Sequence, residues 1–253
     1  MEPVLSLRNI LKRFGGLTAV KHVNLDIFPG EVVGLVGDNG AGKSTLIKCV
    51  SGVYHPDEGE IQFMGQTMAF SKPIDARRVG IETIYQDLAL APNLNISANI
   101  FMGREAKRRY FGGLIKTLDE EKMLSESRRV IDSLDIRLPN FGAQIDKLSG
   151  GQRQAVAIAR AVYWNARLMI MDEPTNNLGV PEQRKVLDLI RKLRESGVPV
   201  ILISHTLPDV FAVTDRIVVM HRGHKVAEKQ TAQTDSQTVV EYMVGARSDV
   251  RAD

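Results

Sequence analysis

The segment at residues 37–45 reads GDNGAGKST, and it constrains the fold of this chain more than any other stretch. It fits the pattern G-x-x-x-x-G-K-[ST], in which glycines let the backbone approach a polyphosphate closely. Successive N–H groups and the start of the following helix then bind the anion. We expect Lys43 to reach the outer phosphates and Ser44 to ligate Mg²⁺. The predicted cradle consists of Gly37, Asp38, Asn39, Gly40, Ala41, Gly42, Lys43, Ser44 and Thr45.

The flanks of this loop favour phosphate binding over a glycine-rich turn that merely precedes a lysine. Residues 31–36 form an apolar run typical of a buried strand, and residues 44–50 favour a helix. Strand, loop and helix therefore follow one another in the order that the pattern requires.

A second apolar run, residues 168–171, suits a strand buried in a parallel sheet, and two carboxylates follow it directly. Ligands bind at the carboxyl ends of such strands. We therefore expect Asp172 to hold Mg²⁺, directly or through water. Glu173 is expected to act as the general base that accepts a proton from an attacking water or polarises it. The alternative is a strand end with two solvated acids, which the phosphate loop makes the weaker reading.

Residues 148–152 read LSGGQ and precede a helix expected at residues 152–164. Ser149 and Gln152 fit the capping box S-x-x-Q. A helix start with Gly150, Gly151 and a free hydroxyl is also a second anion site, and the two interpretations are compatible. Two phosphate sites far apart in one chain suggest that two copies share each nucleotide.

Two further polar residues follow apolar runs. His205 comes after residues 199–204, and we expect it to hydrogen-bond the terminal phosphate and orient the water, although a lone His is more often structural. Gln86 follows the β-branched run 81–85, where a helical stretch begins. Its amide oxygen is a candidate Mg²⁺ ligand. We expect the Gln86 backbone to move with that helical stretch.

Composition sets wider bounds. A chain of 253 residues with 43% hydrophobic content can bury a sizeable core, as one large domain or two modest lobes. The net charge of +3 is only weak evidence for a nucleic-acid partner. The basic run at residues 104–109 favours a solvated helix end or loop, so we expect no nucleic-acid partner.

Cys49 is the single cysteine of the chain, and we expect it to pack as a small residue. This use of cysteine suits a reducing cytosol. Neither a signal peptide nor a span of about 18 apolar residues is found, and we expect a soluble chain.

Hydrophobic patterning divides the chain into an α/β core and a helical insert. Short strands are expected at residues 4–7, 22–28, 59–64 and 81–85, with a hairpin after residue 64, and others at 199–204, 216–220 and 225–227. Helices are expected at residues 119–134 and 182–196. We expect one domain over residues 1–253, in which residues 1–86 and 160–230 form the core, 87–159 the helical insert and 231–253 a polar tail.

These residues together resemble the nucleotide-binding subunit of ATP-binding cassette (ABC) transporters. GDNGAGKST looks like Walker A, residues 168–173 like Walker B, and LSGGQ like the family signature, while Gln86 fits the Q-loop and His205 the switch histidine. Phe14 fits the aromatic residue that stacks on adenine, with a core phenylalanine as the equal alternative. The resemblance spans about residues 4–230.

The family implies a RecA-like P-loop core with an antiparallel β subdomain, and an inserted helical subdomain that carries LSGGQ. It implies that two subunits pack head-to-tail around two ATP molecules with Mg²⁺, so that Ser149, Gly150, Gly151 and Gln152 of one copy contact nucleotide on the other. ATP binding would close the homodimer and hydrolysis would reopen it. The resemblance also implies membrane permease subunits as partners, at the cytoplasmic face of the membrane.

A narrower resemblance lies at residues 84–94 and 99–103, which look like the monosaccharide importers of ribose, xylose and fructose type. Many of those ATPases fuse two cassettes, and this chain resembles the single-cassette members. An external sugar-binding protein is then an indirect partner. One departure is Gly179, which stands where the family often has an Asp, so we leave it out of the predicted site.

Other functions fit less well. A soluble ABC ATPase of DNA repair would carry a very long coiled-coil insert, and one of translation would usually carry two cassettes. A regulator that binds ATP without hydrolysing it would not need Glu173 and His205. A nucleotide kinase would use the Walker A loop but would leave LSGGQ unexplained.

Overall fold

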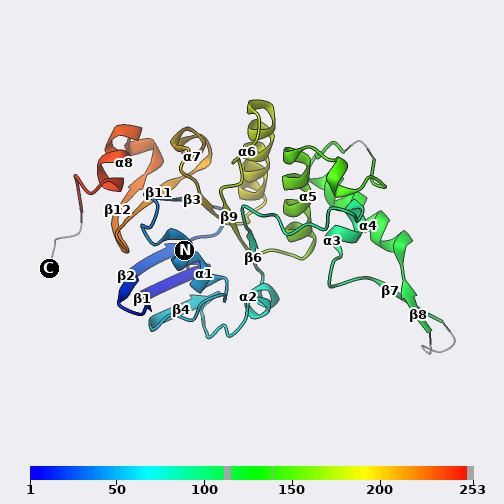
Figure 1. Ribbon diagram of the computed structural model, residues 1–253, viewed down its shortest axis with the longest axis horizontal. Helices are drawn as coiled ribbons and strands as arrows, with labels where there is room; N and C mark the ends of the chain where they lie inside the picture. The colour runs from blue at the N-terminus through cyan, green and yellow to red at the C-terminus, as the bar shows by residue number, and fades with distance from the viewer. Residues whose placement is uncertain (111–114, 139, 250–253) are drawn as a thin grey trace. The chain divides into compact units, whose positions relative to one another are not determined.

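The computed structural model describes residues 1–110, 115–138 and 140–249 (Figure 1). The chain splits into two compact units. The first contains residues 1–86, 166–174 and 190–253, and the second contains residues 87–165 and 175–189. No helix among the described residues combines the length and the hydrophobicity needed to cross a membrane.

A six-stranded sheet forms the centre of the first unit, in the order β12-β11-β3-β10-β9-β6. All neighbours from β11 to β6 pair in parallel, and β12 adds an antiparallel edge. The strands are β3 (Val32–Val36), β6 (Ile81–Ile84), β9 (Leu168–Asp172), β10 (Val200–Ile203), β11 (Arg216–His221) and β12 (His224–Gln230). The central strands are buried apolar runs, as parallel strands covered on both faces require. Three helices of this unit lie beside the sheet: α1 (Lys43–Val50), α2 (Pro73–Val79) and α7 (Leu207–Val213) (Figure 1).

A four-stranded antiparallel sheet, in the order β2-β1-β4-β5, completes the first unit. Its strands are β1 (Leu5–Phe14), β2 (Leu17–Ile27), β4 (Glu58–Phe63) and β5 (Gln66–Met68). β1 and β2 are longer than their sequence patterns predict. Asn9 (φ 55) and His22 (φ 50) adopt left-handed conformations, and shifts of register interrupt the β1–β2 pairing. Such bulges break the alternation of apolar and polar residues that reveals a strand.

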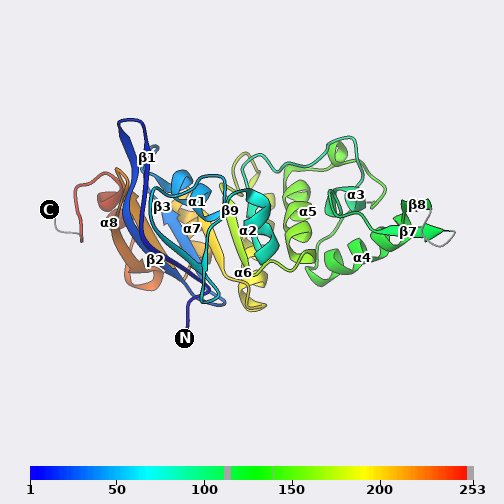
Figure 2. The same ribbon diagram turned by 90° about the horizontal axis from the view of Figure 1, so that it is seen from below.

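The second unit is mainly helical. It contains α3 (Ile96–Ile100), α4 (Glu120–Ser133), a short 3₁₀ turn (Ile145–Lys147) and α5 (Gly150–Tyr163). Helix α6 (Val180–Glu195) runs from this unit into the first. Figure 2 shows α3, α4 and α5 gathered together, with the hairpin β7 (Lys107–Tyr110) and β8 (Ile115–Leu118) extending from them.

The basic run at residues 104–109 is not wholly a helix end or loop, and that expectation is wrong for its second half. Lys107 and Arg108 belong to β7, opposite Leu118 and Thr117 of β8. The Arg108 guanidinium contacts the carboxylate of Asp119 at 3.2 Å. The strand is stabilised by residues about ten positions further along, which local composition cannot reveal.

The predicted polar tail contains a helix, α8 (Ser236–Met243), that the sequence pattern did not indicate. Asp235 caps it by accepting a hydrogen bond from the Thr238 N–H at 2.9 Å. Only Val239 and Tyr242 of α8 are buried, a stripe too short to show helical periodicity. Residues 250–253 of that tail lie outside the described residues.

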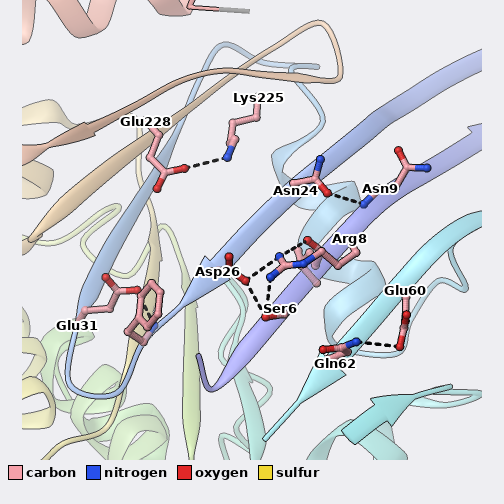
Figure 3. A network of polar contacts seen from close by, with 12 residues as sticks. Ser6, Arg8, Asn9, Asn24, Asp26, Glu31, Glu60, Gln62, Lys225 and Glu228 are labelled. Carbon is pink, nitrogen blue, oxygen red and sulfur yellow. Dashed lines mark hydrogen bonds and ion pairs between the residues drawn. The ribbon is translucent and has the colours of Figure 1, made fainter. Parts of the chain in front are cut away.

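Arg216, at the start of β11, is a buried cation that joins the two sheets of the first unit. Its Nη2 donates to the backbone oxygen of Asp26 on β2 at 2.6 Å and to Glu31 Oε1 at 2.8 Å. Its Nη1 donates to Glu228 on β12. Figure 3 shows these acids in their surroundings, with Lys225 donating to Glu228 at 2.8 Å. The network fixes β2 relative to the parallel sheet.

Candidate functional site

The phosphate loop connects β3 to α1, and its glycines are required by close backbone approach. Gly37 has φ +148, and a Cβ there would lie 2.2 Å from the backbone oxygen of Met220. Gly42 has φ +101, and a Cβ there would lie 2.4 Å from the backbone oxygen of Ala19. Larger residues at either position would force the loop away from its supports. Gly40, at φ +79, faces open space, so its glycine is required by conformation alone.

Lys43, the first residue of α1, folds back over this loop. Its Nζ donates to the backbone oxygens of Gly37 at 2.6 Å and Asp38 at 3.0 Å. Burial lowers the pKa of Lys43, and the carboxylates of Glu173 and Asp172 oppose that shift. The ammonium group therefore lies within electrostatic reach of both acids at the end of β9, Asp172 and Glu173.

A cavity of about 570 Å³ opens beside the loop. It is lined by Phe14, Leu17, Thr18, Ala19, Lys21, residues 39–45, Arg222 and Gly223. Phe14 is 42% exposed, so it is not a core phenylalanine. The Phe14 and Tyr54 rings meet in a T-shaped contact at a centroid distance of 5.1 Å, and Phe14 lines the cavity. A flat ring in the wall of a cavity beside the predicted phosphate loop suits a stacked base.

Sequence reasoning missed several residues of this wall. Lys21 and Arg222 add two cations, and Gly223 adds a backbone N–H that donates to Ala41 of the phosphate loop at 3.0 Å. The only signal was a tight turn at residues 221–224, which indicates a hairpin but not what the hairpin touches. Its role depends on the pairing of β11 with β3, a contact nearly two hundred residues apart in sequence.

Asp172 is the last residue of β9, and Glu173 follows it with φ +53. Burial raises the pKa of Asp172, as does neighbouring Glu173, against the opposing effects of Lys43 and Lys48. Glu173 Oε1 lies 2.9 Å from Nδ1 of His205, and its Oε2 accepts the His205 backbone N–H at 3.4 Å. His205 comes two residues after β10, whose Ile203 lies opposite Asp172 in the sheet. Adjacent strand ends thus bring the two residues together.

Gln86 lies at the same edge of the sheet. It comes two residues after β6, whose Ile84 pairs with Met171 of β9. Gln86 is exposed, and it is the last residue of the first unit before the helical unit begins at Asp87. The position suits a residue that links the sheet edge to the helical unit.

The residues of LSGGQ lie in the second unit, at the start of α5. Ser149 Oγ accepts the Gln152 N–H at 3.3 Å, and Gln152 Oε1 accepts the Ser149 N–H at 2.9 Å. This is the capping box that the sequence predicts, and it is confirmed. A Cβ on Gly150 would lie 2.5 Å from Leu178, and one on Gly151 would lie 2.9 Å from Glu182. Both glycines therefore also allow close packing of the segment before and within α6.

The predicted metal ligands fit a cation by their chemistry. Ser44 offers an exposed hydroxyl, Asp172 a carboxylate and Gln86 an amide oxygen, which are hard oxygen donors of the kind Mg²⁺ takes. Burial, and after it the charge of Glu173, raise the pKa of Asp172, and a bound cation would oppose that shift. Within the described residues, no group of three or more His, Cys, Asp or Glu is gathered around a metal position.

Comparison with known proteins gives close relatives. The sequence pattern of the family described as "ABC transporter" matches residues 20–176. The chain is 47% identical over 243 residues to the "Xylose/arabinose import ATP-binding protein XylG" of Sulfolobus acidocaldarius, covering 96% of this chain and 94% of that protein. It is 42% identical over 252 residues to the "Fructose import ATP-binding protein FrcA" of Rhizobium meliloti, covering 99% and 97%.

Solved structures agree with the fold. MJ1267, an ATP-binding cassette of an ABC transporter, has a TM-score of 0.83 and 25% identity, and the match covers 97% of this chain and 98% of that one. A dimeric post-hydrolysis state of the ATP-binding cassette MJ0796, bound to ADP and Pi, has a TM-score of 0.74 and 26% identity over 90% and 98%. The predicted fold class, a P-loop α/β core with an antiparallel sheet and a helical insert, is confirmed.

Proposed function

The chain belongs to the ABC transporter family, and from that premise we propose that it is the ATP-hydrolysing subunit that powers import of a monosaccharide through a separate permease. The observation that supports hydrolysis best is the Glu173–His205 pair beside the phosphate loop. The relatives named for import of xylose or arabinose and of fructose support the substrate class.

In the proposed reaction the phosphate loop and Lys43 hold the triphosphate, with the adenine against Phe14. Ser44, Asp172 and Gln86 would hold Mg²⁺, which would neutralise charge at the phosphates. Glu173 takes a proton from the attacking water, whose oxygen bonds to the terminal phosphorus while the opposite bond breaks and ADP leaves. His205 orients Glu173 through the 2.9 Å contact and donates toward the developing phosphate charge.

The second unit completes the site in the proposed homodimer. The start of α5, from Ser149 to Gln152, presents N–H groups and a positive helix end. We propose that it binds the terminal phosphate held by the other copy, so that ATP closes the dimer and hydrolysis releases it. The dimeric MJ0796 cassette with ADP and Pi supports this arrangement.

Gln86, at the border of the two units, is proposed to pass the resulting movement to membrane permease subunits. The subunit would then lie against the cytoplasmic face of the membrane, and an external sugar-binding protein would deliver the substrate. A soluble ABC ATPase of repair or translation is not favoured, because the relatives of matching length are named as sugar import proteins.

The test is reconstitution of the chain with a permease and sugar-binding protein in vesicles, with ATP hydrolysis measured against a panel of monosaccharides. The proposal predicts hydrolysis that one sugar stimulates and that Glu173→Gln abolishes. Hydrolysis that no monosaccharide stimulates, together with stimulation by another solute, would remove the sugar assignment while leaving the ATPase. Absence of any hydrolysis in the wild-type assembly would remove both.

A further inference from the structure

The phosphate loop packs against a short segment late in the sequence, residues 220–223, which we call the supporting turn. The backbone oxygen of Met220 fills the space beside Gly37, and Gly223 Cα lies 3.3 Å from where a Cβ on Gly42 would stand. The Gly223 N–H donates to Ala41 at 3.0 Å, and its oxygen accepts the Lys21 N–H at 2.8 Å. A shift of this turn would therefore move the phosphate loop and the β2 wall of the cavity together.

The supporting turn also contacts the end of the C-terminal helix, α8. The imidazole of His221, within the turn, donates from Nδ1 to the backbone oxygen of Met243, the last residue of α8, at 2.8 Å. Gly245, at φ +77, closes over the same ring, since a Cβ there would lie 2.6 Å from Nε2. The end of α8 and the residues just after it therefore both contact the His221 ring.

The C-terminal segment that grips His221 is firmly attached to the core. Val239 and Tyr242 of α8 are buried, and α8 lies beside β11 in Figures 1 and 2. The Tyr242 hydroxyl donates to Asp249 at 2.6 Å, and Lys229 of β12 pairs with Asp249 at 2.7 Å. This anchoring makes the segment rigid enough to fix the position of a ring packed against it.

We propose that His221 is a positioning residue for the nucleotide, through which the C-terminal segment 236–249 holds the phosphate loop in its binding geometry. The inference rests on the proposed function, because it concerns the same nucleotide site. It gives a role to a part of the chain that carries no nucleotide-binding motif. It also identifies the segment as the place from which nucleotide affinity can be altered without touching the cavity.

The test uses two pairs of variants in the full-length protein. His221→Ala removes the ring, whereas His221→Asn keeps a donor in the place of Nδ1. Gly245→Ala pushes a methyl group against the ring. Its matched control is Gly65→Ala, because Gly65 has φ +74 but nothing within 4 Å of the added Cβ. The two alanines impose the same backbone strain, and only one disturbs His221.

The measurements are KM and kcat for ATP hydrolysis, the Kd for ADP and the melting temperature. We expect His221→Ala and Gly245→Ala each to raise KM and Kd by about 5-fold, the scale of one lost hydrogen bond, with kcat at saturating ATP retained. His221→Asn and Gly65→Ala should match the wild type in KM and Kd. The two disturbing variants act from opposite sides of the contact, so the failure of one to fold leaves the other to decide.

Three results would overturn the inference. The first is an unchanged KM and Kd in both His221→Ala and Gly245→Ala. The second is a fall in kcat at unchanged KM, because that pattern reports fewer folded molecules rather than a displaced loop. The third is an equal rise of KM in Gly65→Ala. Failure of the wild type to bind any nucleotide would overturn the proposed function as well, whereas the three results above leave that function in place.

Discussion

Oε1 of Glu173 lies 2.9 Å from Nδ1 of His205, although the two residues are 32 positions apart in the chain. Glu173 holds an unusual φ of +53, and its backbone N–H donates to Ile203 at 2.9 Å, so the end of β9 is tied to the end of β10. A left-handed conformation in a residue other than glycine costs energy that surrounding contacts must offset. The strained residue is therefore Glu173, the proposed general base.

Replacing Glu173 with Gln should abolish turnover while ATP binding persists. The variant keeps the size and hydrogen-bonding reach of the side chain but cannot accept the proton of the attacking water. We expect hydrolysis to fall by about 10²–10⁴-fold, the contribution of general-base catalysis. Steady-state hydrolysis and nucleotide binding by calorimetry check this, with Glu195→Gln on the exposed end of α6 as the control. Wild-type turnover in the Glu173 variant would assign the base to another residue.

Replacing Lys43 with Ala should weaken nucleotide binding. The ammonium group already donates to two loop carbonyls and is attracted by the two acids at the end of β9, so it is placed to meet phosphate oxygens. Loss of a charged hydrogen bond predicts an affinity lower by about 10–100-fold. Lys48→Ala, on the same helix, is the matched control, and an equal loss in the two variants would count against a specific role for Lys43.

Replacing Asp172 with Asn should stabilise the fold while hydrolysis falls to background. Its pKa is raised above the ordinary value of 3.8, first by burial and then by Glu173, so the folded state holds the proton more tightly than the unfolded state. The stability that this contributes is present below pH 3.8 and is lost as the pH rises through the folded pKa. The variant should therefore melt higher than the wild type at pH 7.

The pH dependence of that difference is the check. The gap in melting temperature should shrink as the pH is lowered toward 3.8, because the wild-type carboxyl group then becomes neutral. A variant that melts lower than the wild type at pH 7 would show that the ionised carboxylate is stabilised in the fold. Stability gained at the expense of activity is expected at a functional acid.

Some elements of this fold have a clear hydrophobic pattern in the sequence, and others have none. Strands β3, β9 and β10 are apolar runs buried on both faces, so composition alone indicates them and the residues at their ends. Helix α8 and the hairpin of β7 and β8 lack such patterns. Arg222 and Gly223 could not be assigned to the cavity wall, because only the sheet order brings β11 beside β3. Local pattern predicts local structure, whereas these contacts depend on topology.

Replacing Arg216 with Met should destabilise the first unit by about 3–5 kcal/mol, because it removes a buried cation and leaves the partly buried Glu31 carboxylate without its partner. Burial opposes ionisation of Glu228, but Lys225 and Arg216 outweigh it and lower its pKa. The stability that Glu228 contributes is present above pH 4.5 and is lost as the pH falls through its folded pKa. The variant should therefore lose less stability on acidification than the wild type.

Urea unfolding at pH 7 and at acid pH measures both effects. Arg78→Met is the matched control, because Arg78 is exposed and its contact with Asp75 is 3.6 Å long, so its removal should cost less than about 1 kcal/mol. Equal losses in the two variants would show that the network around Arg216 adds no more than a surface pair.

The most direct test of the shared site is sedimentation of the Glu173→Gln protein with ATP, with and without Ser149→Arg. The account predicts an ATP-dependent dimer in the first case. It predicts a monomer in the second, because a bulky side chain blocks the tip of α5 from the other copy's phosphate. Asp119→Ala, which removes the cap of α4 instead, should still dimerise. ATP-dependent dimers of normal stability in the Ser149→Arg protein would contradict a nucleotide held between two copies.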